Sequence, residues 1–267
     1  KDLARVDFGA YARSLTTHLF ASYAEMVPHV RLSVDISGVF LDINAADVGQ
    51  GQAGRPLNAA FGRTAFTWRY DGWLAANYHS LQVALNKPFS KGFFLKGAYT
   101  FSKAMNRTND EGWSNVDWNY PTLQYKNYGP AGYDRAHIFQ LAFLQNLPFG
   151  KDGSGIGNAI VKNWSLNGVF SAFTGTPFTV GASGASLNAP GNSQYADLVG
   201  NIVKTGDIGS STPYYDTSAW APVTEVRPGN TGRNSVRGPG WWNIDLGLFR
   251  QFPLSKTFTL EARVEAF

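Results

Sequence analysis

The side chains that most often carry out catalysis are sparse and scattered in this sequence. The chain has no cysteine, so it offers neither a thiolate nucleophile nor a disulfide. Its four histidines, at positions 18, 29, 79 and 137, do not have the spacing of a zinc site. No Gly-x-Ser-x-Gly motif occurs, and the glycines between positions 153 and 157 lack the spacing of a phosphate-binding loop. We therefore expect a protein that is not an enzyme and holds no cofactor.

Oxygen ligands gather in one polar segment, residues 106–120, with the sequence NRTNDEGWSNVDWNY. Asp110, Glu111 and Asp117 could offer carboxylates to Ca²⁺, which prefers oxygen ligands. Their spacing does not match the EF-hand loop, and a solvated polar loop is the alternative. No other metal site is expected.

Aromatic and basic side chains in two long segments are the candidates for ligand binding. Rings could stack on a sugar or grip a peptide, and the alternative is that they pack the loops together or lie in an aromatic girdle. Guanidinium groups could attract an anionic ligand or lipopolysaccharide phosphates, and a structural role is the alternative. The candidates are Trp113, Trp118, Tyr120, Tyr214, Tyr215, Trp220, Arg233 and Arg237, with Arg227 near the two arginines.

The elements that position these residues show a period of two. Leu81, Val83 and Leu85 alternate with polar or small residues, and so do the apolar residues between 93 and 101. Residues 90–92 form a short turn in which Gly92 can take positive φ. Each arm runs for about 12 residues, well beyond the usual strand of about 5–6. Similar alternation recurs at 139–147, 164–172, 243–248 and 258–266.

The alternation assigns one face to apolar residues and the other to polar ones. We expect Lys96, Lys103, Asp245, Glu261, Arg263 and Glu265 on the polar face. Strands are also expected near 6–12, 30–36 and 61–69, with 44–60 as a loop. Connections at 90–92, 148–160 and 253–257 are short or moderate, whereas those at 105–136 and 174–240 are long.

Long amphipathic strands with short turns at one end and long loops at the other predict an all-β, antiparallel transmembrane β-barrel. The short turns would be periplasmic and the long loops external. A large soluble antiparallel sandwich is the alternative. Lys and Arg are scattered, so no nucleic-acid partner is expected. Both chain ends lack boundary signals, so we expect residues 1–267 to be part of a single barrel domain in a longer chain.

A set of short motifs resembles the TonB-dependent outer-membrane receptors of the Oar-like class, which carry a carboxypeptidase-regulatory-like domain before the plug. The resemblance covers roughly residues 60–267 in correct order. Its main motifs are Asn77-Tyr78-His79-Ser80-Leu81-Gln82, Tyr99-Thr100-Phe101-Ser102-Lys103-Ala104, Tyr133-Asp134-Arg135-Ala136-His137, Asn163-Trp164-Ser165-Leu166-Asn167-Gly168, Thr174-Gly175-Thr176-Pro177-Phe178, Arg233-Asn234-Ser235-Val236-Arg237-Gly238-Pro239-Gly240 and Arg263-Val264-Glu265-Ala266-Phe267.

This resemblance implies part of a plugged barrel of about 22 strands in the bacterial outer membrane. The implied function is uptake of a large or scarce nutrient, energised through TonB. The implied partners are outer-membrane lipid, an unidentified nutrient, and TonB through parts absent from this chain; the plug and the last strand or strands of the barrel are also expected outside it. Two alternatives remain open, which are a structural or adhesive outer-membrane barrel without transport and a soluble β-rich carbohydrate-binding domain.

Overall fold

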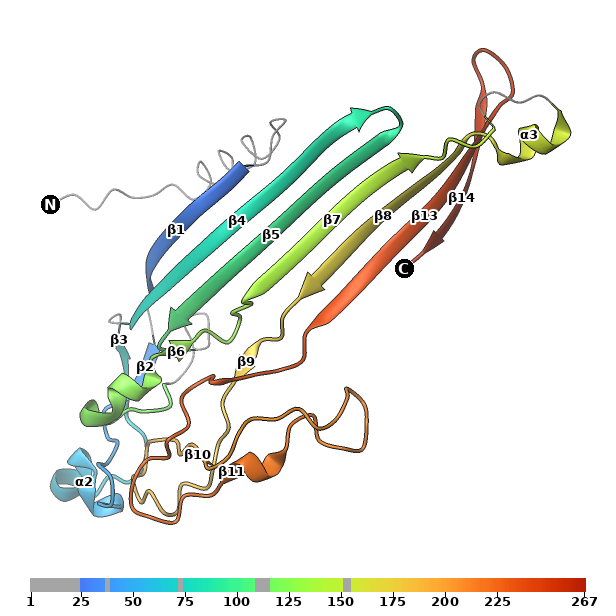
Figure 1. The fold of residues 1–267 in the computed structure, drawn as a ribbon. Coiled ribbons are helices and arrows are strands. Elements are labelled where there is room, and N and C mark those ends of the chain that lie inside the picture. The colour runs from blue at the N-terminus through green and yellow to red at the C-terminus, as the bar shows by residue number, and fades with distance from the viewer. Residues whose placement is uncertain (1–24, 37–38, 72–73, 109–115, 151–154) are drawn as a thin grey trace, which may run out of the picture.

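A computed structural model describes residues 25–36, 39–71, 74–108, 116–150 and 155–267. Its main feature is an antiparallel sheet with the strand order β1-β4-β5-β7-β8-β13-β14, to which the short β6 adds by pairing with β5 (Figure 1). Within the described residues, β1 and β14 each pair on one side only, so the sheet does not close on itself. The strands are β1 Glu25–Ile36, β4 Leu74–Ser90, β5 Phe93–Asn106, β6 Gly129–Pro130, β7 His137–Asn146, β8 Trp164–Phe173, β13 Trp241–Pro253 and β14 Thr259–Ala266.

The two ends of the sheet differ in their connections (Figure 1). At one end Lys91 and Gly92 join β4 to β5, and both have positive φ (51° and 78°), as a tight hairpin turn requires. The same end holds the β7–β8 connection, with helix α3 (Ile156–Val161), and the short β13–β14 turn. The β1–β4, β5–β7 and β8–β13 connections lie at the opposite end and are long. The predicted asymmetry of turns and loops is confirmed.

Strand register places the apolar residues of successive strands on one face. Phe101 lies opposite Leu81, and Tyr99 lies opposite both Val83 and Phe139. On the same face, Phe170 of β8 lies opposite both Leu141 of β7 and Ile244 of β13. Leu248 of β13 lies opposite Val264 of β14. Because directly paired residues share a face, the predicted alternation is confirmed from β4 to β14.

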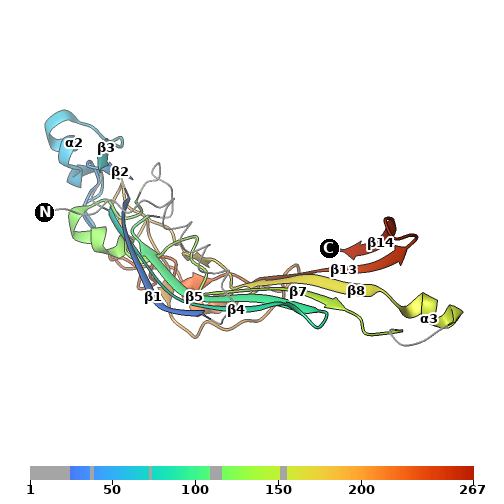
Figure 2. The same ribbon diagram turned by 90° about the horizontal axis from the view of Figure 1, so that it is seen from above.

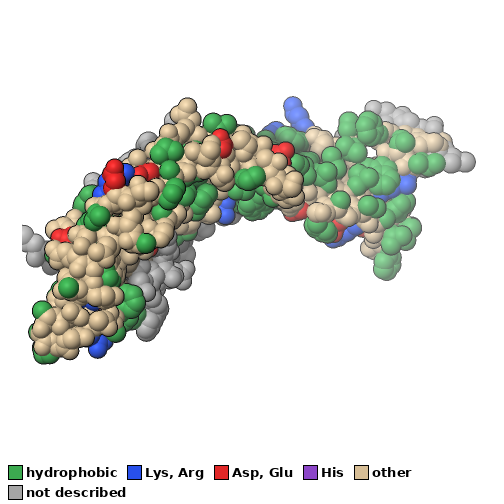
Figure 3. Space-filling view, turned by 90° about the horizontal axis from the view of Figure 1, so that it is seen from below, with side chains coloured by type: hydrophobic (Ala, Val, Ile, Leu, Met, Phe, Trp, Pro, Cys, Tyr) green, Lys and Arg blue, Asp and Glu red, His purple; other side chains and the backbone are tan. Residues whose placement is uncertain are grey.

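Most of this apolar face has no protein layer over it. Phe101, Leu246, Leu260 and Val264 are exposed, although their register groups them with the apolar set. Figure 2 shows the sheet as a single curved layer, and Figure 3 shows hydrophobic side chains gathered over the strands. No helix among the described residues is both long and apolar enough to cross a membrane. An exposed apolar sheet face backed by a polar one fits lipid on one side and an aqueous lumen on the other.

Three expectations for the first half of the chain are wrong. Residues 56–61 form helix α2 (Pro56–Phe61) instead of loop, and only the end of the predicted strand 61–69 joins β3 (Trp68–Asp71). Proline at the first helical turn and Gly62 in the left-handed conformation begin and end this helix.

Lys103, expected on the polar face, lies opposite His79 and shares the face of Phe101. The strand predicted near 6–12 lies outside the described residues.

Short elements complete the long connections. The β1–β4 connection contains the antiparallel pair of β2 (Val39–Asp42) and β3. The helix η1 (Gln52–Gly54) and α2 lie between these two strands, and we call the whole segment the β2–β3 hairpin. The η2 helix (Pro121–Asn127) lies in the β5–β7 connection. The β8–β13 connection pairs β9 (Pro177–Phe178) with β12 (Val236–Arg237), and β10 (Asp197–Leu198) with β11 (Trp220–Ala221), which η3 (Thr217–Ala219) precedes.

Candidate functional site

The three long connections pack together into one unit at the loop end of the sheet. We call it the loop assembly, and it comprises the described residues of 39–71, 107–136 and 174–240. Backbone hydrogen bonds join its segments, such as Ala46 N to Pro190 O at 2.9 Å and Gly49 N to Leu187 O at 3.0 Å. The Asn192 side chain links all three connections, since Nδ2 donates to Ala46 O and Oδ1 accepts from Asn119 N. The loops are therefore a folded unit with fixed contacts.

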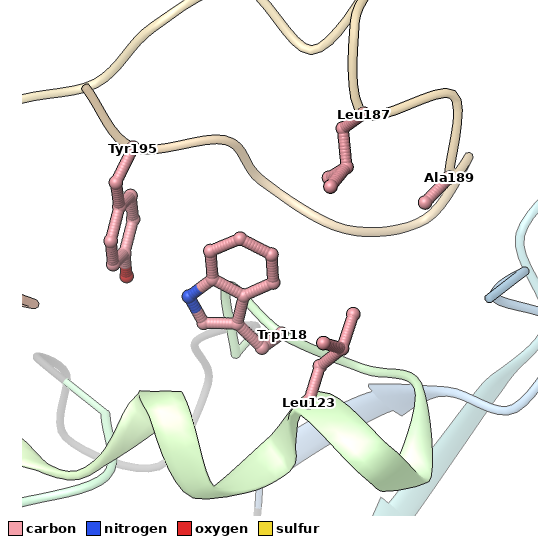
Figure 4. Close-up of a cluster of buried hydrophobic side chains, with 5 residues drawn as sticks. All are labelled: Trp118, Leu123, Leu187, Ala189 and Tyr195. Carbon is pink, nitrogen blue, oxygen red and sulfur yellow. The ribbon is translucent and has the colours of Figure 1, made fainter. Parts of the chain in front are cut away.

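The loop assembly has its own hydrophobic core. Figure 4 shows the Trp118 ring surrounded by Tyr195, Leu187 and Leu123, with its nitrogen toward the Tyr195 hydroxyl oxygen. The rings of Trp118 and Tyr195 meet edge to face, with centroids 5.2 Å apart. Trp118 is fully buried, and Tyr120 packs against the same cluster. Trp118 is a candidate for ligand stacking with loop packing as the alternative, and its full burial matches the alternative.

One carboxylate proposed for Ca²⁺ has a different set of contacts. Asp117 Oδ2 accepts from the Tyr195 hydroxyl at 2.6 Å, and Oδ1 accepts from Ser193 Oγ at 3.3 Å. Burial raises the pKa of the Tyr195 phenol, and the Asp117 charge raises it further, so the phenol stays a donor. Asp110 and Glu111 lie outside the described residues, and so does Trp113. Among the residues that are described, no three His, Asp or Glu side chains gather as a metal site.

Arg233 and Arg237 fasten the loop assembly to the strands. Arg233 is buried, and its Nη1 lies 3.1 Å from Oδ1 of Asn106, the last residue of β5. Arg237 pairs with the buried Asp134 carboxylate, just before β7. Burial lowers the pKa of the Arg233 guanidinium. These contacts match the structural alternative for both arginines, and Arg233 presents little surface to an anion.

The predicted aromatic residues near position 215 form a second cluster. Tyr214 and Tyr215 meet edge to face with ring centroids 4.8 Å apart, and Tyr215 contacts Trp220 at 6.3 Å. The Tyr215 hydroxyl donates to the Arg237 carbonyl at 2.5 Å. All three rings are half-buried. They lie apart from the hydrophobic core around Trp118, since they are not members of that cluster.

Two features of the loop assembly did not emerge from the sequence. A polar cavity of about 590 Å³ lies beside Asp117, Phe178, Thr179 and Asn234. Its hydroxyls are already engaged, since Thr179 Oγ1 donates to Asn234 Oδ1 at 3.0 Å and Tyr195 donates to Asp117.

The second feature is a group of exposed rings on the β2–β3 hairpin, Phe66, Trp68 and Tyr70 with Phe40 beside them. Their spacing of two in the sequence was visible, but the run is too short to separate from an ordinary strand.

Comparison with known proteins agrees with this architecture. The outer membrane beta barrel domain family matches residues 9–267. No curated protein and no solved structure matches the chain. The match overturns the soluble alternatives, both the sandwich and the carbohydrate-binding domain, and it places the protein in the bacterial outer membrane. With its exposed apolar sheet face and its one-sided long loops, the chain belongs to the outer membrane beta barrel domain family.

Proposed function

We propose that this chain is part of an outer-membrane receptor that takes up a large or scarce nutrient with energy supplied through TonB. The observation that carries the proposal is the loop assembly, a folded unit with a buried core at one end of the membrane sheet. A surface held by fixed contacts is preorganised for a ligand, because binding then costs little ordering of the loops. A simple channel needs no such unit.

The residues that carry the resemblance to TonB-dependent receptors lend further support, because they build the base of this unit. Asp134 pairs with Arg237, and Arg233 bonds to Asn106. Gly175 crosses the Gly238 backbone so closely that a Cβ atom on Gly175 would lie 1.8 Å from the Gly238 oxygen. The motifs that carry the resemblance therefore lie where the loop assembly joins the strands.

Uptake in the source bacterium tests the proposal. We expect accumulation of at least one labelled compound, from a panel of ferric siderophores, cobalamin and oligosaccharides, to fall when this gene is deleted. Deleting TonB should lower the same accumulation to the same level. Accumulation that depends on the gene but persists without TonB would contradict the energy source, and a gene deletion without effect on any compound would contradict uptake.

A structural or adhesive barrel is the second candidate. The observation in its favour is a run of exposed apolar side chains between positions 198 and 208, including Val199 and Ile208. Exposed apolar groups on a water-facing unit often mark contacts with other macromolecules. Loss of cell adhesion in the gene deletion, with unchanged uptake of every compound in the panel, would favour this function.

A further inference from the structure

The β2–β3 hairpin carries four aromatic rings that touch one another on the surface of the loop assembly. We call Phe40, Phe66, Trp68 and Tyr70 the aromatic patch. Phe66 lies nearly parallel to Trp68, with ring centroids 5.1 Å apart and 9° between the planes. Phe40 meets Tyr70 and Trp68 edge to face, at 5.3 and 6.5 Å. The rings thus form one continuous aromatic surface.

Buried polar contacts next to the rings hold this surface in place. Phe40 lies opposite Tyr70 in the hairpin, and Asp42 lies opposite Trp68. The buried Asp42 carboxylate accepts from Arg55 at 3.3 Å and from Thr67 N at 2.9 Å. The Arg55 guanidinium lies 5.4 Å from the Phe66 ring centroid. Little conformational freedom remains to be lost when a ligand covers the rings.

The rings are open to solvent in spite of these contacts. Phe66 is 49% exposed, Trp68 43% and Tyr70 58%. Single exposed aromatic residues are ordinary on protein surfaces, whereas contiguous ones on a rigid element mark places where another molecule binds.

The aromatic patch lies beyond the level at which an interfacial girdle would anchor the sheet. The lipid-facing rings nearest the loop end include Phe101 and Tyr99, which contact or bond His137. Tyr70 comes eleven residues before Leu81, the partner of Phe101. Figure 1 shows β2 and β3 beyond the loop ends of β4 and β5. The patch therefore faces water, and lipid contact does not explain it.

The chemistry of the aromatic patch fits a sugar better than an acyl chain. Trp68 and Tyr70 are exposed, and an electron-rich ring face suits the C–H groups of a pyranose. The Trp68 indole N–H and the Tyr70 hydroxyl add polar groups at the ring edges, where sugar hydroxyls would meet them. Arg63 lies alongside, with its Nε 2.6 Å from Thr67 Oγ1 and its Nη2 2.7 Å from Phe66 O. An acyl chain would offer no acceptor to the Trp68 indole N–H or the Tyr70 hydroxyl.

We propose that the aromatic patch is a saccharide-binding site on the outer surface of the protein. It is the capture site of the nutrient if the proposed uptake holds, and to that extent it rests on that proposal. Binding itself requires no transport, so it can be measured without an energised membrane.

The test uses the full protein, solubilised from outer membranes, in native gels that contain hydroxyethylcellulose, xylan or soluble starch. At least one of these polysaccharides should retard the wild-type protein. Trp68→Ala and Tyr70→Ala should each weaken that binding by about tenfold or more, and Trp68→Phe should retain part of it. Phe61→Ala is the matched control, because Phe61 is an aromatic residue of the same connection, 78% exposed, outside the patch. Resistance of the external loops to protease, measured in outer membranes, checks that the loop assembly of every variant is folded.

Retardation by none of the three polysaccharides would overturn the proposal, and so would equal retardation of the wild type and Trp68→Ala. Retardation by a single-stranded oligothymidylate in place of the polysaccharides would overturn it in favour of base stacking. Saccharide binding that depends on Trp68, in a protein without TonB-dependent uptake, would support the site and contradict the transport proposal. Uptake that depends on TonB, together with saccharide binding that does not depend on Trp68, would support the transport proposal and contradict the site.

Discussion

The Arg233 guanidinium donates to the side-chain oxygen of Asn106, and both residues are buried although 127 positions separate them. Asn106 ends β5, and Arg233 lies where the chain returns from its longest connection toward β13. The pair therefore sets the position of the loop assembly over the strands. Its neighbour Arg237 repeats the arrangement with Asp134 before β7.

We predict that Arg233→Met opens the loop assembly and leaves the strands folded. The substitution removes a charge-assisted hydrogen bond and leaves the buried Asn106 oxygen with fewer donors, at a cost of about 1.5–3 kcal/mol. Protease cleavage of the external loops, in outer membranes, should accelerate by roughly tenfold or more. Arg63→Met is the control, because Arg63 is an exposed arginine of the same unit. Equal cleavage rates for the two variants would contradict the role of the pair.

The loop core predicts a second local effect. Trp118→Ala removes a fully buried indole from contact with Tyr195, Leu123 and Leu187, and such truncations cost about 3–5 kcal/mol. The loops of this variant should be cleaved rapidly, while the boiling-dependent gel shift persists because the core lies outside the membrane. Tyr125→Ala, at an exposed ring on η2, should resemble the wild type. A Trp118 variant as resistant to protease as the wild type would mean that the core does not hold the loops.

The ion pair of Asp197 with Arg227 predicts how the loop assembly responds to acid. Arg227 Nη1 and Nη2 reach the two carboxylate oxygens at 2.9 and 2.6 Å. The hydrogen bond from Arg227 lowers the pKa of Asp197, and the Asn230 amide adds to this. A folded-state pKa below the unfolded value gives stability that is present above about pH 4 and is lost as pH falls through the folded pKa.

Hydrogen exchange of residues 194–230, corrected for intrinsic rates, measures this response. Protection should stay constant between pH 7 and 5 and fall below about pH 4. Asp197→Asn should show weaker protection at pH 7 and a smaller change on acidification. A fall in protection centred above pH 5 would assign the transition to some other group.

The strands could be predicted from the sequence, because their signal is local. Alternation along 80–86 and 93–102 identifies both faces of the β4–β5 hairpin without knowledge of any distant residue, and Gly92 marks the turn. Lys103 lies on the apolar face because side chains alternate strictly to the end of β5, whatever the residue type. Helix α2 had usable signals in Pro56 and Gly62, but the three glycines between positions 44 and 60 favoured a loop. The Thr and aromatic residues that follow favoured a strand.

The interior of the loop assembly could not be predicted in the same way. Whether Trp118 is exposed depends on Leu187 and Tyr195, which lie more than sixty residues away in the chain. The contacts of Asn192 with Ala46 and Asn119 are equally distant. Composition shows that the loops contain rings and amides, but only the fold decides which of them face water.

The lipid-facing assignment predicts opposite outcomes for two neighbouring residues of β7. Leu141 lies opposite Gly97 and Phe170 on the apolar face, and Gln140 lies opposite Ala98 and Ser171 on the polar face. Leu141→Arg should cost about 2–4 kcal/mol, because an arginine near the midplane must be carried into lipid. Gln140→Arg places the same charge in the aqueous lumen and should cost little. The folded fraction of each variant, read from gel mobility of unboiled outer membranes, should fall for Leu141→Arg and stay near the wild-type value for Gln140→Arg. A lower folded fraction for Gln140→Arg than for Leu141→Arg would contradict the assignment of the faces. The polar face would then meet lipid, with Glu261 and Glu265 of β14 on it.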